Sequence, residues 1–214
     1  MNNDILQEIE KLIKADETQK SIELFEKALD LYQEIESEKY FSVRYRYALF
    51  LMSTEKASGS YIKKSIELLN DLRSVIELKE NSQIDLAILI LCLGRAYELL
   101  SKFYGNHSGY LRTTINYYEK AAEMFKSQDN HKNWAAAKAS IGYAYGRLGS
   151  QNRVNDIEKA VCNIRDSLEF YTKTDHPDDY WDKMKELARL KSLIKDDSIW
   201  DSIWEEYDKK HLGH

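Results

Sequence analysis

One short segment returns four times along the chain. Each copy opens on a small residue and carries large or apolar residues in the next few positions, giving SIELFEKAL at 21–29, SIELL at 65–69, TINYYEKAA at 114–122 and AVCNI at 160–164. The opening residues lie 44, 49 and 46 positions apart. A period of this length indicates one supersecondary unit per repeat, and such units bury their apolar faces by stacking on their neighbours. The chain is therefore expected to fold as a repeat array.

A second segment lies between copies of the first. LGRAYELL at 93–100 corresponds to IGYAYGRL at 141–148, with Gly94 and Gly142 separated by 48 residues. Alternation of two such segments predicts two helices per repeat, that is, a helical hairpin. Glycine costs helical stability, and here it would allow the two helices of a hairpin to approach closely.

Apolar residues elsewhere recur at spacings of three and four, which is typical of helices. With one proline, Pro177, and eight glycines in 214 residues, the chain has few helix breakers. Short polar or glycine-bearing stretches separate ten expected helices. Their approximate bounds are 4–14, 18–36, 39–56, 60–79, 83–104, 109–127, 131–148, 154–172, 178–194 and 198–210.

The two recurring segments resemble the tetratricopeptide repeat, which has a glycine step in its first helix and small and aromatic residues in its second. The resemblance implies an all-α, right-handed superhelical solenoid of about five antiparallel hairpins, with residues 1–214 as one domain. The match is better over about 18–172, and segments 1–14 and 178–210 are expected to be end caps.

The period exceeds the usual repeat of about 34 residues. The chain is more similar to a long-repeat subfamily in bacterial and archaeal signalling proteins, where the array is often fused to a caspase-like protease or a nucleotide-binding switch. The resemblance therefore implies a scaffold or adaptor in a regulatory or signalling complex.

The same resemblance implies a concave groove lined by the first helices of the hairpins. Projecting the register of the glycine step onto these helices gives the candidate partner-binding residues: Tyr45, Met52, Leu91, Arg95, Glu98, Tyr143, Lys185 and Arg189. Their mixed apolar and basic character suits a peptide or protein segment with apolar anchors and acidic groups. Whether the groove or the convex face binds stays open, as does self-association.

Charge, hydropathy and cysteine usage bear on nucleic-acid binding and on cellular location. The formal net charge of −5 argues against nonspecific nucleic-acid binding. No apolar run is long enough to span a membrane and no signal-peptide pattern opens the sequence, so a cytoplasmic location is expected. Cys92 and Cys162 lie in apolar helical patterns and are expected to be reduced and buried.

An alternative function comes from RYRY at 44–47. Arg44 and Arg46, together with Arg95, could contact phosphates in a ligand- or nucleic-acid-sensing regulator. The structural alternative makes Tyr47 a core residue and leaves Arg44 and Arg46 solvated or ion-paired. Arginines gathered on one face, with no carboxylate opposite, would favour the regulator.

A remoter alternative is a magnesium-dependent diphosphate enzyme, because DDYWD at 178–182 has the DDxxD pattern. NDLRS at 70–74 resembles the start of the second metal motif of such enzymes, but it precedes DDYWD in the chain, which reverses the usual order. Glu77 also lies three residues after Ser74, where that motif needs four. Carboxylates after Pro177 are explained by helix capping. The five histidines show no metal-ligand spacing and are expected at the surface. No catalytic, metal or cofactor-binding residue is expected, and the chain is not expected to be an enzyme.

Overall fold

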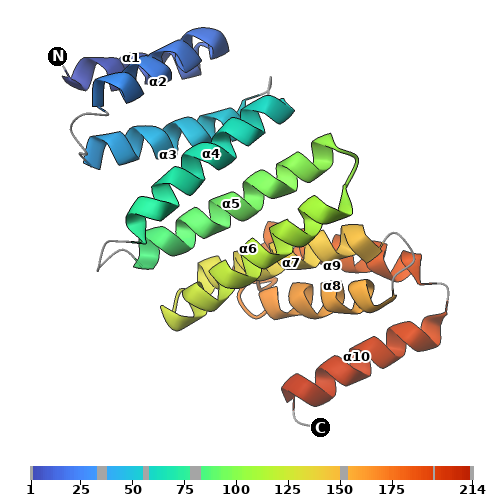
Figure 1. Cartoon of the computed structure of the whole chain (residues 1–214). Helices are drawn as coiled ribbons and strands as arrows, with labels where there is room; N and C mark the ends of the chain where they lie inside the picture. Colours follow the sequence, from blue (N-terminus) through green and yellow to red (C-terminus); the bar gives the residue numbers. More distant parts are fainter. Residues whose placement is uncertain are drawn as a thin grey trace. The chain divides into compact units, whose positions relative to one another are not determined.

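A computed structural model describes residues 2–32, 38–54, 58–77, 83–149, 154–194 and 196–212. These residues form ten α-helices and no β-strand, joined by short connections (Figure 1). The helices are α1 (Asn2–Lys14), α2 (Thr18–Tyr32), α3 (Glu38–Ser53), α4 (Gly59–Ile76), α5 (Gln83–Phe103), α6 (Ser108–Ser127), α7 (His131–Gly149), α8 (Val154–Ser167), α9 (Pro177–Leu193) and α10 (Asp197–Leu212).

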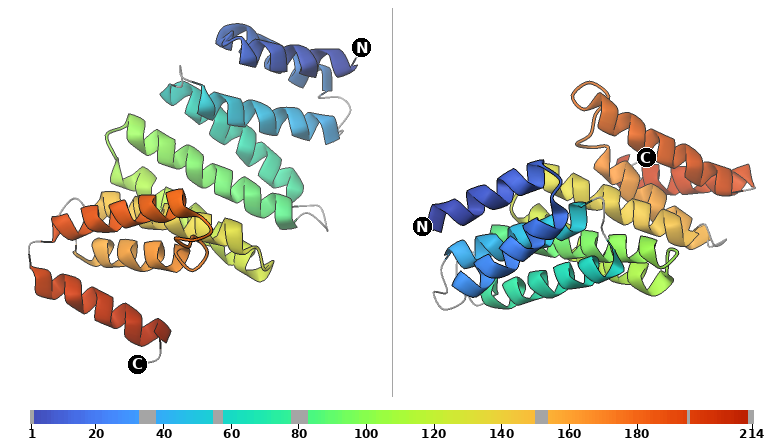
Figure 2. Two further views of the ribbon diagram at one scale, coloured as in Figure 1. Left: turned by 180° about the vertical axis from the view of Figure 1, so that it is seen from behind. Right: turned by 90° about the horizontal axis from the view of Figure 1, so that it is seen from above.

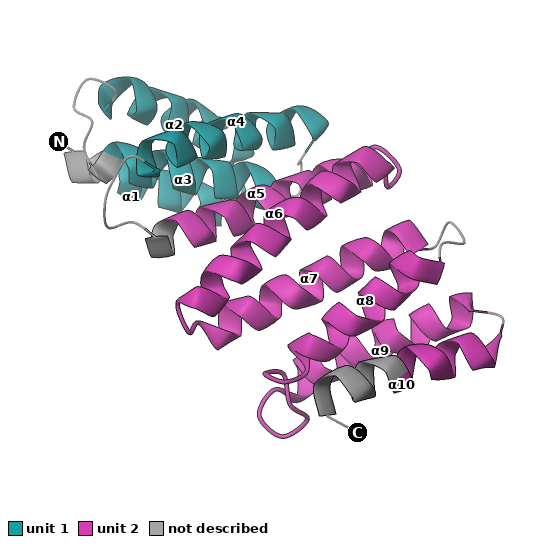
Figure 3. Ribbon diagram, turned by 60° about the horizontal axis from the view of Figure 1, so that its bottom comes forward, with its two compact units in different colours: residues 1–82 teal, residues 83–214 magenta. Residues whose placement is uncertain are grey.

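The chain divides into two compact units, residues 1–82 with α1 to α4 and residues 83–214 with α5 to α10 (Figure 3). The expectation that residues 1–214 form one continuous domain therefore stays a prediction.

The first unit is held together by contacts of α3 with α4, of α1 with α2 and of α2 with α3. The ring of Phe25 on α2 stacks on that of Tyr47 on α3, with centroids 4.9 Å apart. Ser65 on α4 is fully buried, and its hydroxyl donates a 3.0 Å hydrogen bond to the backbone oxygen of Ala48 on α3. The small residue that opens this repeat thus lies in a helix contact.

The second unit contains the hairpins α5/α6 and α7/α8, which pack together through α6 and α7. Helix α9 packs against α7 and α8, and α10 packs against α8 (Figure 2). Trp200 and Ile203 of α10 join the core cluster that contains Ile157 and Ile164 of α8. Helix α10 thus covers apolar residues of α8.

The glycine steps lie at close helix contacts, as the repeat pattern predicts. A Cβ atom at Gly94 would lie 2.6 Å from Cδ1 of Tyr118 on α6. One at Gly142 would lie 2.5 Å from Cγ1 of Ile164 on α8. Tyr118 and Ile164 are the residues four positions after the small openers of their repeats, so both hairpins use the same packing step.

The expected helix bounds agree with the described ones to within a few residues, except at α8. The parts of the expected helices at 33–36, 55–56 and 78–79 lie outside the described residues. Helix α8 ends at Ser167 rather than at 172. From there the backbone forms 3₁₀-type hydrogen bonds, in which the N–H groups of Leu168 and Glu169 donate to the carbonyl oxygens of Arg165 and Asp166, three residues earlier. The hydroxyl of Ser167 also bonds to the backbone oxygen of Ile164, which competes with helix continuation.

The two cysteines are less buried than the sequence pattern predicts. Cys92 and Cys162 are each half-buried rather than buried. A helical position beside a buried stripe is only partly covered when the neighbouring helix crosses at an angle, and sequence spacing does not report that angle.

Candidate partner-binding site

Three candidate residues lie on α5, each in a different environment. Arg95 is exposed. Leu91 is half-buried and packs against the two core clusters that α5, α6 and α7 form. Glu98 is largely buried, with a side chain 18% exposed. Of the three, Arg95 is the one whose charge faces solvent.

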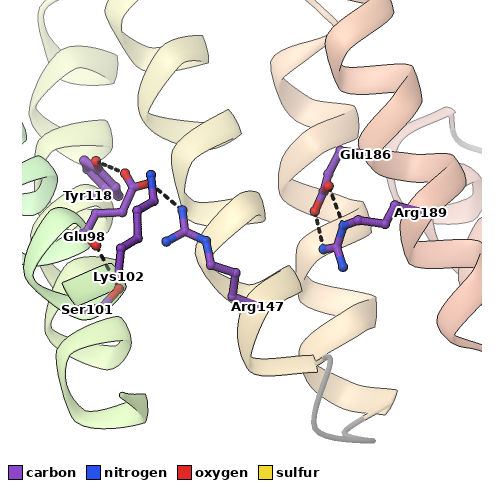
Figure 4. Close-up of polar contacts among 7 residues, drawn as sticks. All are labelled: Glu98, Ser101, Lys102, Tyr118, Arg147, Glu186 and Arg189. Carbon is purple, nitrogen blue, oxygen red and sulfur yellow. Dashed lines mark hydrogen bonds and ion pairs between the residues drawn. The ribbon is translucent and has the colours of Figure 1, made fainter. Parts of the chain in front are cut away.

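Glu98 joins three helices of the second unit (Figure 4). Its Oε2 accepts a 2.8 Å hydrogen bond from the hydroxyl of Tyr118 on α6. Its Oε1 is paired with the guanidinium of Arg147 on α7 and lies 3.2 Å from Nζ of Lys102 on α5. We call this group of four side chains the Glu98 clasp. Each member compensates the buried carboxylate, as a buried charge requires.

The clasp also changes the acidity of its members. Burial by itself would raise the pKa of the Glu98 carboxyl, but the positive charges and hydrogen bonds of its partners outweigh burial and hold the pKa below its usual range. The largest of these opposing effects comes from Arg147. Burial, together with the neighbouring Glu98 carboxylate, raises the pKa of the Tyr118 hydroxyl well above its usual value.

These shifts predict how stability depends on pH. A carboxyl with a lowered folded-state pKa stabilises the fold fully above its unfolded pKa, and this contribution is lost as pH falls through the folded pKa. We therefore expect the stability difference between the native chain and Glu98→Gln to be constant near neutral pH and to shrink in acid. Urea unfolding of both proteins, repeated from pH 7 down to pH values below the usual carboxyl pKa, measures it. A difference that widened on acidification would contradict the assignment.

Tyr143 on α7 lies next to α9. It is half-buried against the core cluster shared by α8, α9 and α10. Burial, with the carboxylates of Glu186 and Asp182 nearby, raises the pKa of its hydroxyl to about 12. The ring thus offers an apolar face and a hydroxyl that stays protonated at neutral pH.

The two basic candidates on α9 differ from each other. Arg189 donates two hydrogen bonds, of 2.7 and 2.5 Å, to the carboxylate of Glu186 in the preceding turn (Figure 4). This pair lies against Gly146 of α7, where an added Cβ would be 2.9 Å from Nη2 of Arg189. Lys185 has a side chain 78% exposed and pairs with the exposed Asp182, at 3.2 Å. Arg189 is therefore part of a helix contact, whereas Lys185 is a solvated charge.

The remaining two candidates belong to the first unit. Tyr45 is half-buried, and Met52 is buried among the core residues. The other six candidates lie in the second unit, on α5, α7 and α9. The assignment of all eight residues to partner binding stays a prediction.

In the arginine-rich stretch at 44–47, both arginines are ion-paired and Tyr47 is a core residue. Arg44 lies 3.3 Å from Asp71 of α4 and 4.5 Å from the ring centre of Tyr40, and Arg46 lies 2.5 Å from Glu10 of α1. Tyr47 is 2% exposed. Carboxylates thus stand opposite both arginines, which is the arrangement that disfavours the phosphate-contacting regulator.

The DDxxD stretch lies at the start of α9. Asp178 and Asp179 occupy the first turn after Pro177, as capping predicts. Asp179 also pairs with the buried Lys183, at 3.6 Å. Within the described residues, no group of three or more His, Cys, Asp or Glu side chains is placed to hold a metal ion. The acidic stretch is accounted for by the favourable position of carboxylates at a helix N-terminus and by local ion pairs.

The histidines show one departure from the surface prediction. His107 and His131 are exposed, whereas His176 is half-buried and stacks on Phe170 with ring centroids 4.9 Å apart. The side chain of His211 and all of His214 lie outside the described residues. His176 precedes α9, and the stacking depends on the turn after α8, which the sequence pattern treated as helix.

Sequence reasoning did not find the partners of Glu98. Lys102 could have been found, because a glutamate and a lysine four residues apart on a helix commonly pair. Arg147 could not, since it is 49 residues away and reaches Glu98 only because α5 and α7 both pack on α6.

Comparisons with known proteins support the fold. No protein-family model matches the sequence, and no curated protein matches it significantly. The similar solved structures include two of nearly identical TPR-like repeats from a predicted kinesin light chain of Podosopora anserina. The single-substitution variant has a TM-score of 0.67, 14% identity, and coverage of 99% of this chain and 96% of its own. The other has a TM-score of 0.63, 14% identity, and coverage of 98% and 96%.

At this identity the likeness shows the fold alone, and the fold is that of TPR-like helical repeats, as the recurring segments predicted. Among the described residues, no helix is both long enough and apolar enough to cross a membrane.

Proposed function

We propose that the chain is a protein-binding scaffold, of the kind that works in a regulatory or signalling complex. In this proposal the second unit holds a segment of a partner on the face formed by α5, α7 and α9. The observation that supports it is a TPR-like fold in which Arg95 of α5 and Lys185 of α9 are exposed, while the ring of Tyr143 on α7 is half-buried against a cluster that includes α9.

The chemistry of this face supports a particular kind of segment. Arg95 and Lys185 are exposed charges whose side chains can reorient toward a partner. Tyr143 adds a rigid surface with a hydroxyl that can donate a hydrogen bond, a combination favoured at interfaces. A segment with one apolar or aromatic anchor flanked by carboxylates would be complementary to all three.

Charge reversal at two solvated positions tests the proposal. We expect Arg95→Glu with Lys185→Glu to reduce capture of native partners at least tenfold, because two attractive contacts become repulsive. Capture from the source lysate by immobilised protein, quantified by mass spectrometry, measures it. Arg189 is left unchanged, because its reversal would set two carboxylates against each other beside Gly146.

The matched control is Lys120→Glu with Lys159→Glu, which makes the same charge change on α6 and α8. Both lysines are exposed. The proposal requires the control to retain the partners that the first variant loses, with circular dichroism showing both folded. Equal retention in both variants, or loss only in the control, would refute the assignment to α5, α7 and α9.

A further inference from the structure

A second surface of the same unit contains a cavity among α6, α7 and α8. Its volume is about 660 Å³, within the range of about 300–1,000 Å³ usual for ligand sites. The lining residues are Glu119, Ala122, Glu123 and Lys126 of α6, His131, Trp134, Lys138 and Ile141 of α7, and Asn163, Asp166 and Glu169 of α8 and the turn after it.

The lining is amphipathic and carries net negative charge. Trp134, Ala122 and Ile141 supply its apolar part, and the first of these packs against two core clusters. Four carboxylates face two lysines in the lining, which leaves two negative charges if His131 is neutral. A cation is therefore the charge complement of this cavity.

One part of the cavity already binds a cation of the chain itself, the ammonium group of Lys138. Its ammonium nitrogen lies 2.7 Å from Oδ2 of Asp166 and 3.0 Å from Oδ1 of Asn163. The same nitrogen is 6.0 Å from the ring centre of Trp134. One lining carboxylate is thus neutralised from within the chain.

The other three lining carboxylates have no such internal cation among the described contacts. Glu119 accepts only a 3.4 Å hydrogen bond from the neutral hydroxyl of Tyr145. For Glu123 and Glu169, no ion pair is recorded with any residue that the structure describes. Lys126, which is exposed, is the second lining lysine. Negative charge therefore remains on the α6 side and at the turn after α8.

We propose that this cavity binds an arginine-bearing segment of a partner protein. A guanidinium is planar, so it can lie on the indole of Trp134 and donate two parallel hydrogen bonds to a carboxylate. The cavity volume exceeds that of one side chain, so it accommodates several consecutive residues of the segment. The site is distinct from the α5, α7 and α9 face, because it involves Lys138 and Ile141 of α7 rather than Tyr143.

Calorimetric titration of the whole chain with short peptides tests the proposal without a known partner. The probe is an acetylated hexapeptide of alternating arginine and alanine, at low ionic strength. Its two comparison peptides replace arginine by citrulline, which has nearly the same shape but no charge, and by glutamate. We expect the arginine peptide to bind at least tenfold more tightly than the citrulline peptide, and the glutamate peptide not to bind.

Two variants locate the binding. Glu123→Gln with Glu169→Gln removes two lining charges with little change in shape, and we expect it to weaken the arginine peptide at least tenfold. Glu23→Gln with Glu67→Gln makes the same change in net charge on exposed positions of α2 and α4, and should leave binding unchanged. Absence of arginine-peptide binding, equal binding of the citrulline peptide, or equal weakening by both variants would overturn the proposal. Because the titration uses no native partner, its result is independent of the capture experiment.

Discussion

Gly142→Leu should lower the free energy of unfolding by about 3 kcal/mol, at the upper end of the cost of overpacking a core. A Cβ atom at this position would lie 2.5 Å from Cγ1 of Ile164 and 3.0 Å from the backbone oxygen of Ala160. The side chain could rotate away, but the backbone oxygen belongs to α8 and cannot move without separating the two helices. Leucine is a better helix former than glycine by less than about 1 kcal/mol, so the steric cost dominates.

Gly109→Leu is the matched control. Gly109 also lies in a helix, but it is exposed, and an added Cβ would meet only the side chain of the exposed His107, at 3.1 Å. We expect it to change stability by less than about 1 kcal/mol. Guanidinium unfolding followed by circular dichroism compares the two variants. An unfolding midpoint for Gly142→Leu at or above that of the native chain would show that α7 and α8 do not pack at this step.

Arg147→Met should lower the free energy of unfolding by about 2 kcal/mol, because it removes a charged hydrogen-bond partner from a largely buried carboxylate. The methionine keeps most of the apolar stem, so the change isolates the charge. The full cost of breaking a buried pair is not expected, since Lys102 and Tyr118 remain bound to Glu98.

A double-mutant cycle with Glu98→Gln separates the interaction from the loss of either side chain. We expect the double variant to lose less unfolding free energy than the sum of the two single-variant losses, because it no longer contains an unpaired carboxylate. Arg46→Met is the exposed control: its partner Glu10 is 51% exposed, so the loss should be below about 1 kcal/mol. Additive losses in the cycle, measured by urea unfolding, would mean that the Glu98 clasp does not couple α5 to α7.

For two of the candidate residues, repeat register was enough to predict that the side chain is exposed. The register placed Arg95 on an exposed face of α5 and Lys185 on an exposed face of α9. It could not distinguish Arg189 from Lys185, although both lie on the same helix stripe. The difference comes from Glu186 and from the approach of α9 to Gly146, which are properties of packing between repeats.

Burial was the property that register predicted least well. Met52 lies at a groove position by register yet is buried. Glu98 also lies at a groove position by register, yet its carboxylate is bound by Tyr118 and Arg147 from two other helices. In each case the outcome depends on how far neighbouring helices cover a face, and that depends on crossing angles rather than on spacing along one helix.

The sequence by itself determined the helices, their pairing into hairpins and the close contacts at Gly94 and Gly142, because local periodicity and the small residue of each repeat dictate these features. Only the tertiary structure decided that Glu98 lies in a clasp, that Arg44 and Arg46 face carboxylates, and that a charged cavity lies among α6, α7 and α8. These features join residues distant in the chain, and their energies depend on distances and burial that only packing sets.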